Sequence, residues 1–96
     1  LKAAYFEWAS PGAAARQLRA HIAHHEEQRL QALRVIEELQ ERTQPTLARR
    51  LNGYPEQEWD RIVRFKVFAY EGQVANADKE IAWALRGLEI LQDLGE

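Results

Sequence analysis

The sequence predicts an all-α protein in which a short N-terminal helix precedes two long antiparallel helices. These long helices are expected to form a hairpin of coiled-coil type and to pack in a two-fold dimer. The 96 residues include only five Gly and three Pro, while strong helix formers such as Ala, Leu, Arg, Glu and Gln dominate. Two long uninterrupted stretches carry apolar residues at helical spacing. The second stretch is apolar on two sides, which requires two packing partners.

The N-terminal segment, residues 2–8, is long enough for one or two helical turns, and it carries the aromatic residues Tyr5, Phe6 and Trp8. Ser10 and Pro11 then predict the start of the first long helix. A serine side chain caps a free amide, and proline is tolerated at the first helical position. This helix is expected to run to about Thr43, because the residue before Pro45 avoids the α region.

The connection and the second long helix follow from the next turn signals. Residues 46–52 are expected to form a helical turn that Thr46 caps and Asn52-Gly53 closes. Pro55 then opens the second long helix, which runs to about Leu94 and stops at Gly95. Two helices of about 50 Å joined by about a dozen residues must lie antiparallel.

The second long helix carries apolar residues on opposite sides. One side is expected to pack on the first long helix; it holds Trp59, Val63, Val67, Tyr70, Val74, Ala77, Ile81, Leu85 and Leu88. The first long helix has one apolar stripe, with Leu18, Ile22, Ala32, Leu33, Ile36 and Leu39, and so covers only one side. The N-terminal aromatic segment could cover part of the other side, and a second copy of the chain is expected to cover the rest. The predicted dimer interface is therefore Phe65, Phe68, Trp83, Ile90 and Leu94.

Composition excludes several functional classes. Thirteen Lys and Arg against fifteen Asp and Glu give a net charge of −2, without the basic face that nucleic-acid binding needs. The absence of Cys excludes disulfides and thiol nucleophiles and fits a reducing cytoplasm, the expected location. No apolar run approaches the roughly 20 residues that span a bilayer, so no membrane partner is expected. The single serine is a helix cap, and neither catalytic residues nor a cofactor is predicted.

All three histidines lie close together, as His21, His24 and His25. Spacings of three and four residues let two imidazoles share a helical face as metal ligands, and Glu26 and Glu27 could add carboxylates. A metal site needs a third ligand with a fixed position, and the sequence places none, so no metal is predicted. A partly solvated cluster and a pH-sensitive interface are the other two interpretations.

Two polar residues, His25 and Arg29, project into the centre of the apolar stripe of the first long helix. In a hairpin that turns near residue 49, they would face residues 69–73, which include Tyr70 and Glu71. A buried charge must be paired, so Arg29 is expected to pair with Glu71, with His25 and Tyr70 nearby. The four residues could form either a polar layer that fixes the helix register or a polar ligand pocket.

Three stretches resemble a known family. They are YFEWASP at residues 5–11, a long Arg/Glu/Leu-rich helix at residues 16–42, and FAYEG at residues 68–72 followed by ADKEIAWAL at residues 77–85. Together they resemble the C-terminal helical domain of PadR-like transcriptional regulators, also called the virulence-activator C-terminal domain. The resemblance covers nearly the whole chain.

The resemblance implies that residues 1–96 are the dimerisation and effector-sensing domain of a bacterial regulator. Operator DNA would be bound only by a winged helix-turn-helix domain upstream of this chain, and the partner would be a second copy. Relatives respond to phenolic acids or bulky hydrophobic drugs, which implies a small hydrophobic or phenolic effector. A free-standing helical protein-interaction domain without any link to DNA would share the same physical features, and it is the alternative.

Overall fold

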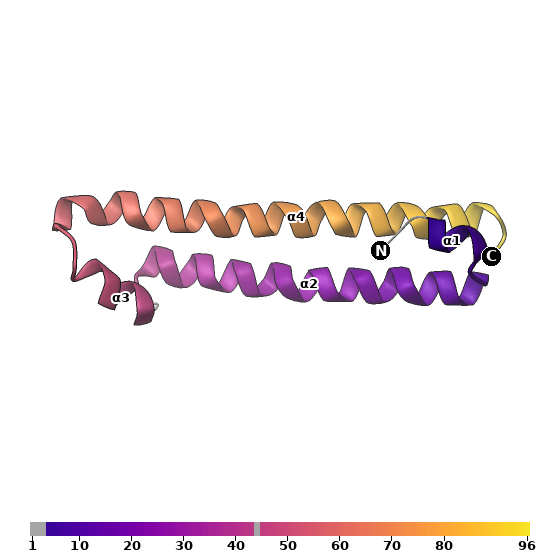
Figure 1. Ribbon diagram of the computed structural model, residues 1–96, viewed down its shortest axis with the longest axis horizontal. Helices are drawn as coiled ribbons and strands as arrows, with labels where there is room; N and C mark the ends of the chain where they lie inside the picture. Colours follow the sequence, from indigo (N-terminus) through magenta and orange to yellow (C-terminus); the bar gives the residue numbers. More distant parts are fainter. Residues whose placement is uncertain (1–3, 44) are drawn as a thin grey trace.

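The computed structural model describes residues 4–43 and 45–96, together with their side chains except at positions 4, 5 and 11. The elements are α1 (Ala4–Trp8), α2 (Pro11–Glu41), α3 (Pro45–Leu51), a 3₁₀ turn η1 (Glu56–Glu58) and α4 (Trp59–Asp93). The two long helices, α2 and α4, lie side by side and antiparallel in a rod of 60 × 17 × 17 Å (Figure 1). The predicted all-α hairpin is thus confirmed. No helix among the described residues has the length and apolar character that crossing a membrane requires.

Helix α2 begins as the sequence predicts and ends differently. The Ser10 hydroxyl accepts a hydrogen bond from the Ala13 amide at 3.3 Å, and Pro11 is the first helical residue. The helix ends at Glu41 rather than at Thr43, because Arg42 adopts a left-handed conformation with φ of 59°. The Thr43 amide then donates to the Glu38 carbonyl at 2.9 Å. A local cap, not the following proline, therefore ends α2.

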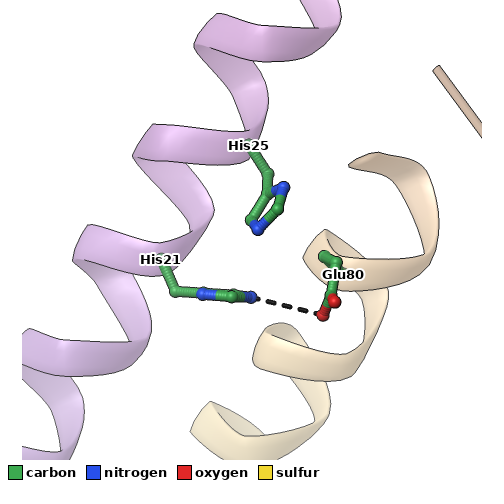
Figure 2. A group of neighbouring side chains, drawn as sticks. All are labelled: His21, His25 and Glu80. Carbon is green, nitrogen blue, oxygen red and sulfur yellow. Dashed lines mark hydrogen bonds and ion pairs between the residues drawn. The ribbon is translucent and has the colours of Figure 1, made fainter. Parts of the chain in front are cut away.

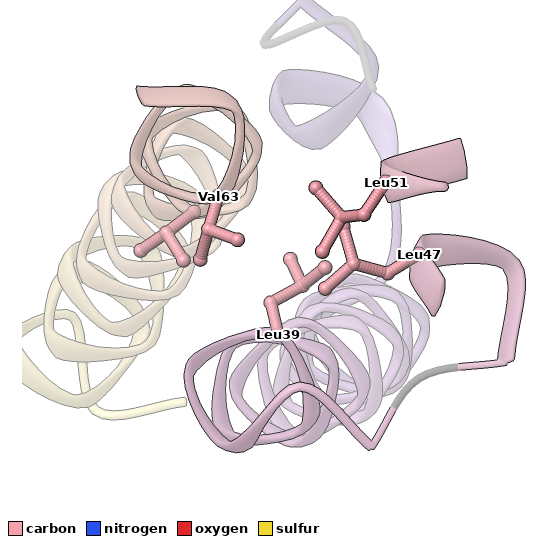
Figure 3. Packing of buried hydrophobic residues seen from close by; sticks show 5 residues of the cluster. Leu39, Leu47, Leu51 and Val63 are labelled. Carbon is pink, nitrogen blue, oxygen red and sulfur yellow. The ribbon is translucent and has the colours of Figure 1, made fainter. Parts of the chain in front are cut away.

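The connection contributes a large part of the hydrophobic core. Helix α3 starts at Pro45, so Thr46 lies within its first turn instead of capping it. Its two leucines, Leu47 and Leu51, are buried and point toward side chains of α2 and α4 (Figure 3). We call this cluster the loop-end core; it comprises Leu39, Leu47, Leu51, Val63 and Val67.

The start of α4 is fixed by one indole group. Pro55 is followed by the η1 turn, so the α-helix begins at Trp59 rather than at the proline. The Trp59 indole N–H donates to the Leu51 carbonyl at 2.8 Å and to the Tyr54 carbonyl at 3.1 Å. These bonds tie the end of α3 to the first turn of α4. At the other end, Gly95 has φ of +78° and stops α4, as the sequence predicts.

The contact between α2 and α4 follows a seven-residue repeat, which we call the seam. On α4 its buried and half-buried positions are 63, 67, 70, 74, 77, 81, 84, 88 and 91. Such a repeat drifts by about 20° per heptad relative to a straight helical stripe. Leu33 and Leu85 lie on the straight stripes that the sequence predicts, yet they are 38 % and 50 % exposed. The drift of the seam explains why these two leucines, which were expected to pack between the helices, are exposed instead.

Away from the loop end, most of the fully buried positions between α2 and α4 are alanines. Ala14, Ala32, Ala77 and Ala84 are buried there. A Cβ added to Gly87 would lie 2.9 Å from the Leu18 Cδ1 atom. The two helices therefore approach closely in this half of the rod.

Candidate functional site

Three side chains with metal-ligating atoms meet between α2 and α4. His21 and His25 are four residues apart on one face of α2, and Glu80 of α4 points back toward them (Figure 2). One nitrogen of each imidazole and one carboxylate oxygen lie within 4.8 Å of one another, and all three residues are half-buried. We call these residues the His–His–Glu cluster.

Neighbouring groups hold the first histidine in place. The His21 Nε2 atom lies 3.3 Å from the Glu80 Oε2 atom, and the two side chains are only 15 % and 31 % exposed. The indole of Trp83 meets the His21 ring edge-on, with ring centroids 5.5 Å apart. The His25 ring lies 4.4 Å from that of His21, also edge-on. Packing and one polar contact thus restrict the orientation of His21.

The second histidine is held without a polar partner. The Nδ1 atom of His25 is buried and has no hydrogen-bond partner among the described residues. Burial, and then the neighbouring His21, lower the pKa of His25 below its usual 6.5; Glu80 opposes this, and His24 adds to it. The lowered pKa favours the neutral imidazole, which is the form that binds metal ions.

The polar set predicted from the sequence is not assembled in the way expected. The Arg29 Nε atom pairs with the Asp78 Oδ1 atom at 2.8 Å rather than with Glu71, which is exposed. Tyr70 instead packs against the loop-end core. The α3 helix moves the turn of the hairpin further along the chain, so His25 and Arg29 face residues about two turns beyond those expected.

Sequence reasoning missed one acidic residue of α4, Glu80, whose side chain joins the His–His–Glu cluster. Glu80 lies three residues after the buried Ala77 and four before the buried Ala84, spacings that place all three on neighbouring positions of one helix face. An acidic residue on the same helix face as two buried alanines could have indicated a polar site between the helices. The candidates named instead, Glu26 and Glu27, are both exposed, and they lie outside the His–His–Glu cluster.

The predicted interface residues form an exposed apolar row on α4, which we call the outer row. Phe65 is 59 % exposed, Phe68 67 %, Trp83 39 %, Ile90 45 % and Leu94 67 %. The rings of Phe65 and Phe68 meet edge-on, with centroids 6.3 Å apart, and the Arg61 guanidinium lies 5.1 Å above the Phe65 ring. This end of the row is therefore an ordered aromatic surface.

At its other end, the outer row borders a groove of about 440 Å³. Phe6 of α1 contacts Trp83, with ring centroids 6.3 Å apart, so the N-terminal segment covers part of the row, as expected. Trp8 adds little cover, because it is 87 % exposed, and the Tyr5 side chain lies outside the described part of the chain. The groove is lined mainly by apolar residues, including Leu18, Gly87, Ile90, Leu91 and Leu94.

Neither protein-family models nor curated proteins give a match to this chain. The resemblance to PadR-like regulators consequently depends on the motifs quoted above. Function has to be argued from the hairpin, the outer row and the His–His–Glu cluster.

Proposed function

We propose that this chain is a dimerisation domain whose outer row pairs with a second copy. The observation that carries the proposal is the exposure of five large apolar side chains along one side of α4. Groups of exposed large apolar side chains, such as Phe65 with Phe68 and Trp83 with Ile90, mark interaction surfaces on soluble proteins. The hairpin itself cannot cover them, because α2 occupies the seam on another side of α4.

The size and shape of the chain support the same proposal. Its accessible surface is 7160 Å², about 1,500 Å² more than the about 5,700 Å² expected for a compact monomer of its mass. The radius of gyration is 19.1 Å, against about 13 Å for a compact domain of this length. A standard interface buries about 800 Å² per partner. The excess surface is thus large enough for one full interface.

A second copy is the partner that fits best. The outer row extends from Phe65 to Leu94, just after the end of α4, with a gap between Phe68 and Trp83. A two-fold axis would lay the same row of the second copy against it. Such isologous pairing is the commonest arrangement of soluble oligomers. It would also bury the outer row, which the hairpin leaves exposed.

We further propose that the dimer serves a PadR-like bacterial transcriptional regulator. The motif resemblance supports this, as does the capped start of α2 at Ser10 within the quoted YFEWASP motif. The two-fold axis of the dimer would match the symmetry of operator half-sites, which a DNA-binding domain upstream would contact. The apolar groove beside Trp83 has the size of small-molecule pockets and suits a hydrophobic or phenolic effector.

Light scattering on outer-row variants tests the dimer. Phe68→Glu places a charge in the proposed interface and is expected to convert the dimer to a monomer of 11.2 kDa. Leu30→Glu is the matched control, because Leu30 is 52 % exposed on α2 and lies outside the outer row. It should leave the dimer intact. Equal loss of the dimer in both variants, or in neither, would contradict the assigned surface.

The coding sequence upstream of Leu1 tests the link to DNA. About 80 to 100 residues with a helix-turn-helix pattern and a basic recognition helix would support a regulator. A gene product without such a region would favour the free-standing helical interaction domain instead.

A further inference from the structure

We propose that His21, His25 and Glu80 bind a divalent transition-metal ion, preferentially Zn²⁺, and that the ion links α2 to α4. The sequence alone predicts no metal site, because it places no third ligand. The structure supplies that ligand from the opposite helix. The inference does not depend on dimerisation, because all three ligands come from one chain.

The distances fit a small, tetrahedral ion. Bond lengths of about 2.0–2.2 Å from Zn²⁺ to nitrogen and oxygen place two tetrahedral ligand atoms about 3.4 Å apart. The His21 Nε2 and Glu80 Oε2 atoms already lie 3.3 Å apart. The His25 ligand atom lies within 4.8 Å of both, so it would have to move by about 1.4 Å to reach the ligand spacing of a tetrahedral ion.

The state of His25 also favours a ligand role. A buried imidazole nitrogen without a hydrogen-bond partner is costly, and His25 Nδ1 is such an atom. Coordination through Nδ1 would give this atom a partner and leave Nε2 as the N–H donor. A simple pair between His21 and Glu80 would need no second histidine on the same helix face. A shared ion would account for the half-buried position of His25 on the same face of α2 as Leu18, Ala32 and Leu39.

The chemistry of the three ligands selects the class of metal. Two imidazoles and a carboxylate suit Zn²⁺, Co²⁺ and Ni²⁺, whereas Ca²⁺ and Mg²⁺ prefer oxygen ligands throughout. Two histidines and a glutamate leave the fourth position of Zn²⁺ open to water or a small ligand. The half-buried position of the cluster gives solvent access to that fourth position.

Isothermal titration of the tag-free chain with Zn²⁺ tests the proposal. One ion per chain is expected, and neither Ca²⁺ nor Mg²⁺ should bind at the same concentrations. His25→Gln and Glu80→Gln each remove one ligand and should weaken Zn²⁺ binding by more than about tenfold, since even outer-shell changes cost roughly 10–100-fold. His24→Gln is the matched control, because His24 is an exposed neighbour outside the cluster. It should change the affinity by less than about threefold, because the His24 ring meets the His25 ring edge-on but supplies no atom to the cluster.

Two outcomes would overturn the site. One is the absence of Zn²⁺ binding to the wild-type chain; the other is an equal loss of affinity in His24→Gln and His25→Gln. Circular dichroism shows whether each variant keeps its helices. A measurement on the wild-type chain avoids variants altogether: ¹⁵N NMR should show one nitrogen of His21 and one of His25 shifting on Zn²⁺ addition, with His24 unchanged. Shifts in His24 alone would contradict the assignment.

Discussion

The two ends of the rod are built on different principles. At the loop end, three helices contribute large side chains to one cluster, with Leu39 from α2, Leu47 from α3 and Val63 from α4 (Figure 3). Toward the open end, the buried side chains are mainly alanines together with Leu18, and the polar His–His–Glu cluster lies between α2 and α4. We therefore expect substitutions in the loop-end core to lower the free energy of unfolding most. The open end carries the His–His–Glu cluster and the groove beside Trp83, while the outer row extends along both halves of the rod.

The largest effect is expected from a truncation in the loop-end core. Leu47 is 1 % exposed, and Leu47→Ala leaves a cavity there. It should lower the free energy of unfolding by about 2–5 kcal/mol, measured by urea denaturation at a fixed chain concentration. Leu30→Ala, at a 52 % exposed position, is the matched control and should change it by less than about 0.5 kcal/mol. Similar losses in both variants would show that the loop end is no better packed than the surface.

The next largest effect concerns the join between α3 and α4. Trp59→Phe removes the indole N–H that donates to Leu51 and Tyr54. The free energy of unfolding should fall by about 1–2 kcal/mol, because two carbonyls lose a donor. Trp8→Phe provides a control, since Trp8 is 87 % exposed. Thermal unfolding of the two variants side by side measures the difference. An unchanged midpoint for Trp59→Phe would show that the indole hydrogen bonds do not stabilise the fold.

Two glycines of α4 test how closely the two long helices pack at different points along the rod. Gly72 has open space where a Cβ would lie, so Gly72→Ala should stabilise the helix by about 0.5–1 kcal/mol. Gly87→Ala should instead destabilise by about 1 kcal/mol, because overpacking against the buried Leu18 outweighs the gain in helix propensity. Chemical denaturation of both variants gives the sign of each effect. Stabilisation by both would mean that the seam is loose at Gly87.

The smallest expected effect is a loss in the free energy of unfolding when His25 is protonated, which occurs only on acidification. Because the folded pKa of His25 is lowered from 6.5, the unfolded chain binds this proton more readily than the folded chain. The metal-free chain should lose stability as pH falls below about 6.5 toward the folded pKa, and it should show no such slope above that range. The charged or titratable groups that affect His25 are His21 and His24 on α2 and Glu80 on α4.

Urea denaturation in EDTA at about pH 7.5 and about pH 5.5 measures this slope above the range of most carboxylates. His25→Gln should lose less stability between these two pH values than the wild-type chain. An equal loss in both proteins would assign the slope to other groups.

Much of the fold could be predicted because its signals are local. The Ser10 cap, the Gly95 stop and the hairpin all follow from neighbouring residues or from helix length, and the structure confirms them. The left-handed Arg42 that ends α2 has no comparable signal, since glycine or asparagine usually fills that position.

The candidate site was less predictable because it depends on how α2 and α4 align. The partners of His25 and Arg29 change with each turn by which the hairpin shifts, and α3 sets that shift through the burial of Leu47 and Leu51. Packing of the connection against the two long helices cannot be read from periodicity. The third ligand, Glu80, was missed for that reason.

The central claim is that this hairpin is half of a dimeric core, and sedimentation of the wild-type chain tests it most directly. A dilution series from about 100 μM to about 1 μM covers the range in which specific protein pairs associate. We expect a species of twice the 11.2 kDa chain mass at the upper concentrations. A monomer throughout the series would contradict it, because the outer row would then stay exposed without a partner.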